Sequence, residues 1–350
     1  MELLEKTIKE ISLLNQTKMT AAKKRLDSLT KPPGSLGKLE ELAIRLAGIT
    51  EEVMVDVSNK AHIIMVGDHG VVKEGVSAFP QQITGQMVQN FLQGGAAINV
   101  LSKQVGAQVE VVDIGMVEEI DNEDLRVEKV KPGTDNIAVG PAMNRKETVR
   151  SLEVGIKVVE DMIASGAQLI GTGEMGIGNT TPSSAILAAS TDLSLEQVVG
   201  YGTGIDEAGL EKKKNVIAQA LEVNQPQVDD GIDILSKVGG LEIGGMAGVM
   251  LGAAAHRVPV IIDGLISGAA ALIAHKIEPQ VSNYLLASHQ SVEPGHIKIY
   301  EALDLEPLLD LDMRLGEGTG AVLSMNLVEA AANIINEMAT FSEAGITVEG

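Results

Sequence analysis

A single carboxylate stands among three glycines near the C-terminal end of the chain, in the stretch from Arg314 to Gly320. Glycine lets the backbone turn tightly and approach a ligand closely, so this spacing leaves Glu317 free to be held over a substrate. A carboxylate that is walled off from water has a raised pKa and becomes a usable general base near neutral pH. The alternative is a glycine-rich turn with a solvated Glu before the helix expected at 321–339.

A second carboxylate, Glu174, follows a predicted strand at 168–172 and opens a run rich in Gly, Ser and Thr. In this run free backbone amides and the hydroxyl of Thr180 precede a small-residue helix at 185–189, and this combination can hold an anion. The run matches neither the Walker A pattern nor Gly-x-Gly-x-x-Gly, so it favours a phosphate monoester over a nucleoside triphosphate. A glycine turn with a Ser/Thr N-cap is the alternative.

Two further features could complete a sugar-phosphate site. A helix after a second glycine-rich turn carries the basic cluster Lys212 to Lys214, and one of these side chains can reach a phosphate while the others face water. A solvated helix face is the commoner meaning of such a cluster. Asp263 ends the predicted strand 258–263, a position suited to binding a ribose hydroxyl pair.

The polar loop after the predicted strand 61–66 contains Asp68 and His69. Both side chains can ligate a metal, but no His-x-x-x-His or similar spacing accompanies them. We therefore predict no metal site and no cofactor. We expect Asp68 and His69 to tie their loop together by hydrogen bonds.

Apolar segments of strand length alternate with helical patterns, which predicts an α/β fold: a Rossmann-like parallel sheet covered by helices on both faces. Polar, glycine-rich loops follow the strands, at the edge where such sheets bind ligands. The N-terminal part and the last helix lack strands. We predict a small helical lobe from 1–60 plus 321–350, and a large α/β domain at 61–320 that carries the active-site loops. The strands are expected at 61–66, 108–113, 168–172, 258–263 and 284–287.

Composition narrows the classes of partner. Among 350 residues, 45% are hydrophobic and 2% aromatic, so the core consists of Ala, Val, Ile, Leu and Met. The net charge of −21 repels nucleic acid and anionic membranes. No apolar run approaches the roughly 20 residues that span a bilayer, so we expect no membrane insertion. The absence of cysteine rules out disulfides and thiolate chemistry, and it fits a reducing cytoplasm.

These motifs, in this order, resemble the nicotinate-nucleotide–dimethylbenzimidazole phosphoribosyltransferase family, and the resemblance extends over nearly the whole chain. The resemblance implies transfer of the phosphoribosyl group of nicotinate mononucleotide to 5,6-dimethylbenzimidazole, with inversion at the anomeric carbon. It also implies a homodimer with a Rossmann-like large domain and a small domain built from both chain ends. The stretches that carry it are Leu29 to Glu40, Gly67 to Pro80, Gly173 to Thr181, Asp263 to Gly264, Ser288 to Gly295, and Arg314 to Gly320.

The resemblance also implies roles for single residues. Glu317 resembles the family's general base, which takes the ring N–H proton of the benzimidazole. Glu174 lines the same pocket and supports the positive charge that develops at the sugar. Ser77 and Gln86 are expected in the aromatic base pocket. The predicted ligands of the phosphoribosyl group are Gly176, Gly178, Asn179, Thr180, Lys213, Asp263, Ser291 and Arg314.

The cationic pyridinium of nicotinate mononucleotide is already a good leaving group, so its departure needs no protonation, metal or covalent intermediate. Two other functions stay open at this point. One is a non-catalytic protein that binds nucleotides or azoles. The other is a metal-dependent hydrolase using Asp68, His69 and Asp263. The sequence does not select among benzimidazole, adenine and phenolic acceptors.

Overall fold

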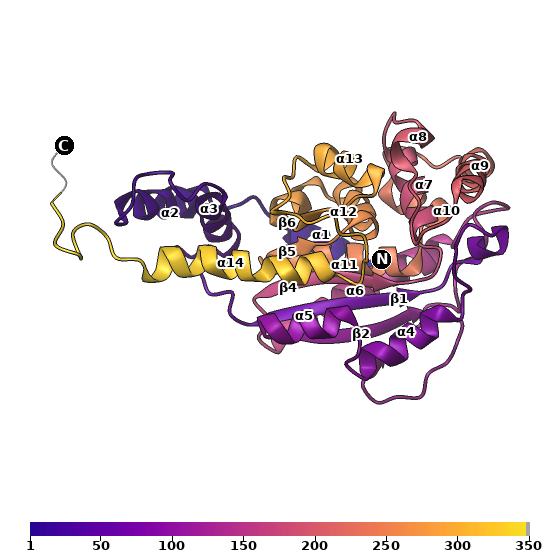
Figure 1. The fold of residues 1–350 in the computed structure, drawn as a ribbon, viewed down its shortest axis with the longest axis horizontal. Helices are drawn as coiled ribbons and strands as arrows, with labels where there is room; N and C mark the ends of the chain where they lie inside the picture. Colours follow the sequence, from indigo (N-terminus) through magenta and orange to yellow (C-terminus); the bar gives the residue numbers. More distant parts are fainter. Residues whose placement is uncertain (348–350) are drawn as a thin grey trace.

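The centre of the molecule is a parallel sheet of six strands in the order β3-β2-β1-β4-β5-β6 (Figure 1). The structure is a computed structural model and describes residues 1–347. All neighbouring strands pair in parallel, which confirms the predicted Rossmann-like sheet. The strands are β1 (Lys60–Gly67), β2 (Ala107–Gly115), β3 (Leu125–Val127), β4 (Leu169–Met175), β5 (Val260–Ile262) and β6 (Leu285–Ala287).

The five strands expected from the sequence are all present, and three short ones were missed. Strand β3 lies within 117–140, a polar stretch whose sequence predicts a turn. It is a three-residue edge strand that pairs with β2 from Val111 to Asp113. The other two, β7 (His289–Gln290) and β8 (Leu309–Asp310), form a separate two-stranded sheet. Strands this short carry too little periodicity to be recognised from sequence.

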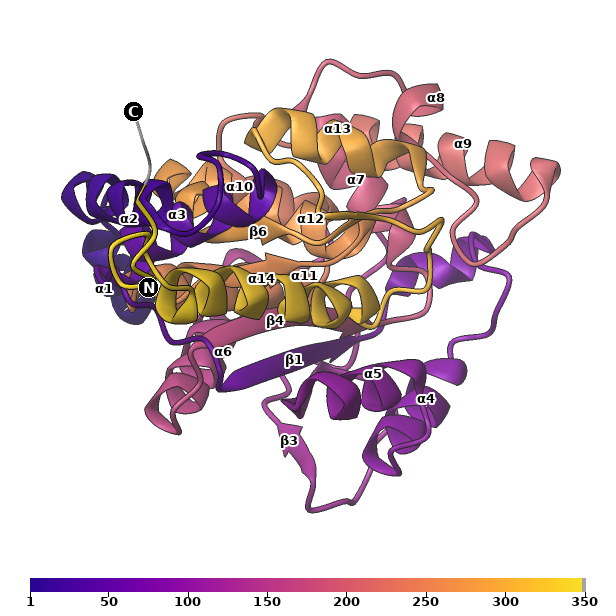
Figure 2. The ribbon, with the colours of Figure 1, turned by 60° about the vertical axis from the view of Figure 1, so that its left-hand side comes forward.

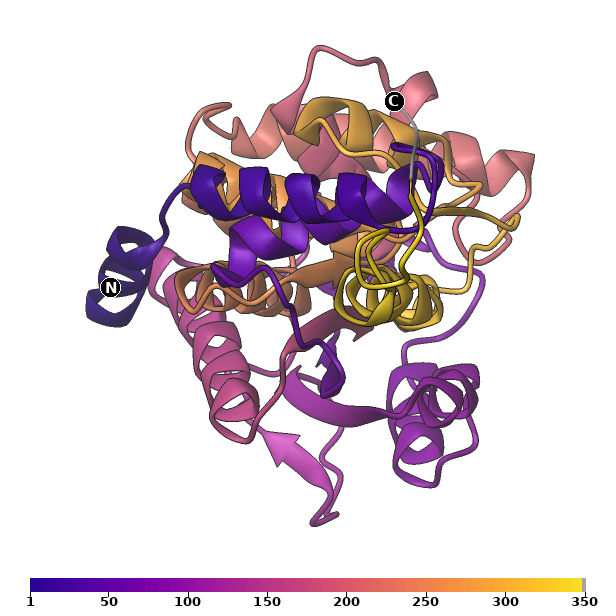
Figure 3. The ribbon, with the colours of Figure 1, turned by 90° about the vertical axis from the view of Figure 1, so that its left-hand side faces the viewer.

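Helices cover both faces of the sheet because the strands are apolar on both sides. In β1, Ile63 and Met65 face one core, and Ile64 and Val66 face the other. The first core is shared with α6 (Arg145–Ala164), α10 (Gly231–Val238), α11 (Leu241–Ala255) and α12 (Leu265–Ile277). The second is shared with α4 (Ile83–Leu92), α5 (Ala97–Val105) and α14 (Thr319–Glu337). Figure 3 shows α6 in magenta and α14 in yellow on opposite sides of the strands.

The remaining helices surround these layers. Those near the carboxyl ends of the strands are η1 (Gly70–Glu74), α7 (Thr180–Ser190), α8 (Leu195–Val198), α9 (Glu207–Asn224) and α13 (Pro294–Leu303). The others are α1 (Glu2–Glu10), α2 (Gln16–Ser28), α3 (Lys38–Thr50) and η2 (Pro279–Tyr284). Within residues 1–347, none of these helices has the length and apolar character that crossing a bilayer requires.

Helices α2 and α3 from the N-terminal part of the chain lie beside α14 from the C-terminal part (Figures 1 and 2). The guanidinium of Arg25 on α2 donates to the carbonyl of Ile335 at 2.7 Å, and Leu29 forms an isolated β-bridge with Thr340. By contrast, α1 packs against α6 and α11. The division into two domains at residues 60 and 321 stays a prediction, and the last part of the predicted lobe, 348–350, lies outside the described residues.

Helices α6 and α11 cross at close range because glycines line their contact. A Cβ on Gly155 of α6 would overlap the carbonyl oxygen of Gly245 on α11. Gly248 likewise leaves room for the backbone of Leu152. Through α11 this close pair packs against β1 and β4, the strands on either side of the point where the sheet order reverses.

We predict that Gly155→Ala destabilises the protein by about 1–3 kcal/mol, because the added methyl forces the two backbones apart. Thermal and denaturant unfolding measure the change. Gly140→Ala is the matched control, since a Cβ there meets no atom within 4 Å. Equal stability of the two variants would contradict the close-packing account.

Candidate active site

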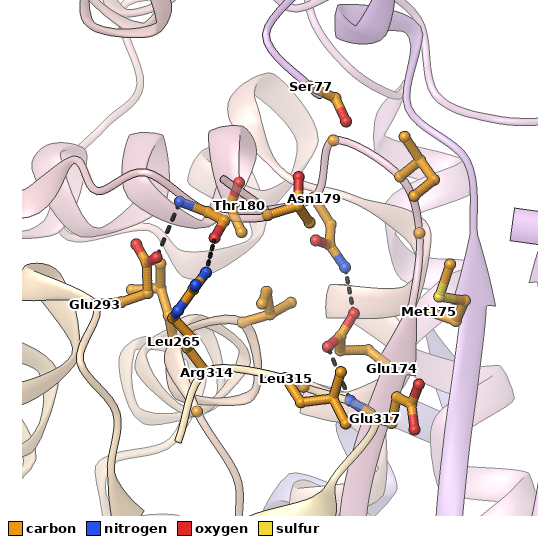
Figure 4. A pocket seen from close by; sticks show the side chains of 18 of the residues that line it. Ser77, Glu174, Met175, Asn179, Thr180, Leu265, Glu293, Arg314, Leu315 and Glu317 are labelled. Atoms are coloured by element: carbon orange, nitrogen blue, oxygen red, sulfur yellow. Dashed lines mark hydrogen bonds between the residues drawn. The ribbon is translucent and has the colours of Figure 1, made fainter. Parts of the chain in front are cut away.

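A cavity of about 370 Å³ opens at the carboxyl ends of the strands (Figure 4). The order of the sheet reverses between β1 and β4, and such a switch point is where doubly wound sheets bind ligands. All but two of the predicted site residues line the cavity: Ser77, Glu174, Gly176, Gly178, Asn179, Thr180, Asp263, Ser291, Arg314 and Glu317. The sheet thus brings together loops that are distant in sequence.

The loop that carries Glu317 has an unusual backbone. Gly316, Glu317 and Gly318 have positive φ angles of 85°, 62° and 86°. A left-handed conformation costs a residue with a Cβ about 1–2 kcal/mol, so the surroundings must hold Glu317 in place. Its side chain is only 6% exposed. The sequence predicted a tight turn here but not the left-handed carboxylate.

The side chain of Asp263 binds the backbone that follows Glu317. Its Oδ1 accepts hydrogen bonds from the backbone amides of Gly320 at 2.8 Å and Ala321 at 3.1 Å. Its Oδ2 accepts from the amide of Gly318 at 3.2 Å. The carboxylate therefore satisfies the free amides at the start of α14 and suits the positive end of the helix dipole. The prediction that Asp263 binds ribose stays a prediction, whereas its contact with the Glu317 loop was not foreseen.

Glu174 lies beside Glu317 in the cavity (Figure 4). Its Oε2 accepts from the side-chain amide of Asn179, and its Oε1 accepts from the backbone amide of Glu317 at 3.4 Å. A Cβ on Gly316 would lie 2.5 Å from Oε1, so this approach requires glycine.

Burial raises the pKa of both carboxyl groups. For Glu174 burial, reinforced by the charges of Glu242 and Asp263, raises the pKa to about 8. For Glu317 burial also raises the pKa, with a smaller contribution from Asp263, against the opposing effect of the Ile98 amide. Groups with raised pKa values in one cavity are suited to accepting protons near neutral pH.

On the opposite side of the cavity, donors surround the start of α7. Lys213 does not line the cavity, but its Nζ donates to Thr180 Oγ1 at 2.8 Å and to the carbonyl of Gly200 at 3.2 Å. Burial lowers the pKa of Lys213 to about 8, and the charge of Glu293 opposes this shift. Arg314 Nη1 donates to the carbonyl of Gly202 at 3.4 Å. A helix N-terminus with two cations beside it favours an anion.

Glu293 is a cavity residue that the sequence did not single out. Its Oε1 accepts from the amide of Gly202 at 2.9 Å, which ties two glycine-rich loops together. Its own amide donates to Ser291 Oγ at 3.4 Å. Residues 288–295, which include Glu293, have the sequence of an ordinary loop. Only the family resemblance marked this segment as functional.

Of the two residues expected in the base pocket, one lines the cavity. Ser77 lines the cavity. Gln86 does not, because its side chain is exposed on α4. Ile83 and Met87, which flank Gln86 on the same helix, line the cavity instead. This wall is apolar, with further contributions from Val76, Phe79, Met175 and Ile177.

Asp68 and His69 hold their loop in place, as the sequence predicted. Asp68 Oδ2 accepts from the amide of Val117 at 2.8 Å. His69 Nε2 lies 2.8 Å from Glu242 Oε1, with both side chains buried. Within the part of the chain that the structure describes, no three His, Asp or Glu side chains are grouped so that they could hold a metal ion.

Comparisons with known proteins point to one family. A family model described as phosphoribosyltransferase matches residues 11–346. The chain belongs to this family. It is 55% identical to a nicotinate-nucleotide–dimethylbenzimidazole phosphoribosyltransferase from Desulforamulus reducens and 56% identical to one from Chloroflexus aggregans, each over 99% of both chains. A crystal structure of CobT from Thermus thermophilus is similar with a TM-score of 0.92 and 46% identity, over 95% of this chain and 100% of that one.

The raised pKa of Glu174 predicts how stability depends on pH. Below about pH 4.5 the carboxyl group is protonated in both the folded and the unfolded state. Between about pH 4.5 and 8 only the unfolded state releases the proton, so the folded state loses stability as the pH rises. Glu174→Gln removes this loss. We expect its free energy of unfolding, relative to the unmodified chain, to rise with pH by up to about 1.4 kcal/mol per unit.

Chemical denaturation at a series of pH values measures this difference. Glu222→Gln, at an exposed position, is the control and should show no such slope. If the difference in free energy of unfolding between Glu174→Gln and the unmodified chain stays constant across the same pH range, Glu174 has an ordinary pKa.

Proposed function

We propose that this chain transfers the phosphoribosyl group of nicotinate mononucleotide to 5,6-dimethylbenzimidazole or a related azole, giving α-ribazole 5′-phosphate and nicotinate. The observation that carries the proposal is the position of Glu317, a buried carboxylate that shares one cavity with a cluster of anion-binding groups. The names of its full-length relatives support the same reaction.

The two sides of the cavity suit the two substrates. Thr180 and Arg314 lie on one side, and Met175 and Glu317 lie on the other (Figure 4). We assign the first side to the phosphate, together with the amides of Gly176 and Gly178, Asn179, and the cation Lys213. We assign the apolar wall to the azole, because a dimethylated aromatic ring gains from leaving water for such a surface.

The reaction then needs one proton transfer and one displacement. The Glu317 carboxylate takes the N–H proton of the azole, while the other ring nitrogen attacks C1′ of the ribose. The bond from C1′ to the pyridinium nitrogen breaks, and its electron pair leaves with nicotinate. Positioning of this kind can lower a barrier by roughly 7–11 kcal/mol. A carboxylate base adds a factor of roughly 10² to 10⁴.

We assign Glu174 to support of the positive charge at the sugar. Without ligand its pKa of about 8 keeps it largely protonated near neutral pH. A nearby cation favours the ionised form of a carboxyl group. The pyridinium and the developing oxocarbenium charge therefore draw Glu174 into its charged form only when substrate is bound.

We further propose that the chain works as a homodimer in the cytoplasm. At the mouth of the cavity, Phe79, Tyr201 and Leu315 are 47%, 44% and 59% exposed. Burying such side chains against a second subunit is favourable. The absence of cysteine supports a reducing compartment. We also retain the small helical lobe built from 1–60 plus 321–350 as a proposal.

Glu317→Gln tests the proposed base. The amide keeps the size of the side chain but cannot take a proton, so we expect turnover to fall about 10² to 10⁴-fold. Binding of nicotinate mononucleotide should change little. Release of nicotinate in the presence of dimethylbenzimidazole measures turnover, and calorimetry measures binding.

Glu337→Gln is the matched control, because Glu337 is exposed at the far end of α14, the helix that follows the Glu317 loop. It should keep full activity. If Glu317→Gln also keeps near-normal turnover, Glu317 is not the base.

A further inference from the structure

His62 is a fully buried polar side chain in the middle of β1, a strand that is otherwise apolar apart from Lys60 at its start. Its ring occupies a slot between β4 and the start of α14. A Cβ on Gly171 would lie 2.8 Å from Nδ1, and one on Gly173 would lie 2.5 Å from Nε2. A Cβ on Gly318 would overlap the ring itself. Three glycines from two elements thus make the space for this imidazole.

Among residues 1–347 the ring has one hydrogen-bond partner, and it is Glu317. His62 Nε2 lies 2.8 Å from the backbone carbonyl oxygen of Glu317. A carbonyl only accepts hydrogen bonds, so Nε2 carries the proton. The backbone amide of Glu317 is bound on the other side, by Glu174 Oε1 at 3.4 Å. Both backbone polar groups of this left-handed residue are therefore fixed by buried side chains.

We infer that His62 is a positioning residue: by fixing the Glu317 carbonyl, it holds the peptide that aims the Glu317 carboxylate at the azole. The inference rests on the proposed function, because it needs Glu317 as the base. Asp263 accepts from the amides of Gly318, Gly320 and Ala321, and none of these bonds involves the Glu317 carbonyl. His62 supplies that remaining contact.

The imidazole acts as a neutral donor. Its Nδ1 is buried and has no hydrogen-bond partner within the described part of the chain, so a second proton on the ring would be buried and unpaired. Burial lowers the pKa of His62 to about 4. A residue that only filled this slot would be apolar, because burying an imidazole carries a desolvation cost that an alkyl side chain avoids.

Two amide variants distinguish a His62 that positions Glu317 from one that only fills the slot. In His62→Gln the side-chain amide nitrogen takes the place of Nε2 and can still donate to the Glu317 carbonyl. In His62→Asn the amide nitrogen takes the place of Nδ1, which faces Gly171, and cannot reach the carbonyl. We expect kcat of the Gln variant within about threefold of the unmodified chain, and a loss of about tenfold or more for Asn. The Kd for nicotinate mononucleotide, measured by calorimetry, should stay within about twofold for both.

Ile63→Ala controls for loss of stability. Ile63 lies on the same strand but faces the opposite core, so this variant should lower Tm and leave kcat unchanged. Equal kcat for His62→Asn and His62→Gln would overturn the inference. The inference also fails if Ile63→Ala, at the same Tm as His62→Asn, shows the same loss of kcat. It fails as well if His62→Asn loses binding of nicotinate mononucleotide.

Glu317→Gln in the same assay keeps the two proposals apart. If Glu317→Gln is inactive and His62→Asn is as active as His62→Gln, only the role of His62 fails. If Glu317→Gln is active, the base assignment fails and the role of His62 fails with it.

Discussion

The left-handed backbone at Glu317 is the constraint on which the site depends. A left-handed conformation costs a residue with a Cβ about 1–2 kcal/mol, and here the support comes from buried side chains on or directly after three different strands. Asp263 after β5 binds the amides at the start of α14, Glu174 on β4 binds the amide of Glu317, and His62 on β1 binds its carbonyl. The parallel sheet is what brings these three residues to one loop.

The same arrangement explains the chemistry. It places several carboxyl groups close together and away from water, and both effects disfavour their charged forms. The pKa values of Glu174 and Glu317 are raised as a result. In the absence of substrate, burying these carboxyl groups costs free energy of folding. A bound cationic substrate lowers that cost. Binding of the pyridinium nucleotide and ionisation of Glu174 are therefore linked by electrostatics.

Much of this could be predicted from the sequence, and the omissions have physical reasons. The parallel sheet followed from apolar strands ending in glycine-rich loops, and Glu317 stood out because glycines flank it. Strand β3 was missed because three residues show no period. The capping role of Asp263 and the contact of His62 were missed because they join residues far apart in the chain. Gln86 was expected in the base pocket, yet helical spacing turns Ile83 and Met87 toward the cavity and leaves Gln86 exposed.

A crystal structure of the protein with 5,6-dimethylbenzimidazole and a non-reacting analogue of nicotinate mononucleotide tests the central claim most directly. The account predicts a ring nitrogen of the azole within about 2.6–3.2 Å of the Glu317 carboxylate, with the phosphate at the start of α7 beside Thr180. An azole bound with both nitrogens away from Glu317, or a phosphate outside the α7 cradle, would contradict it.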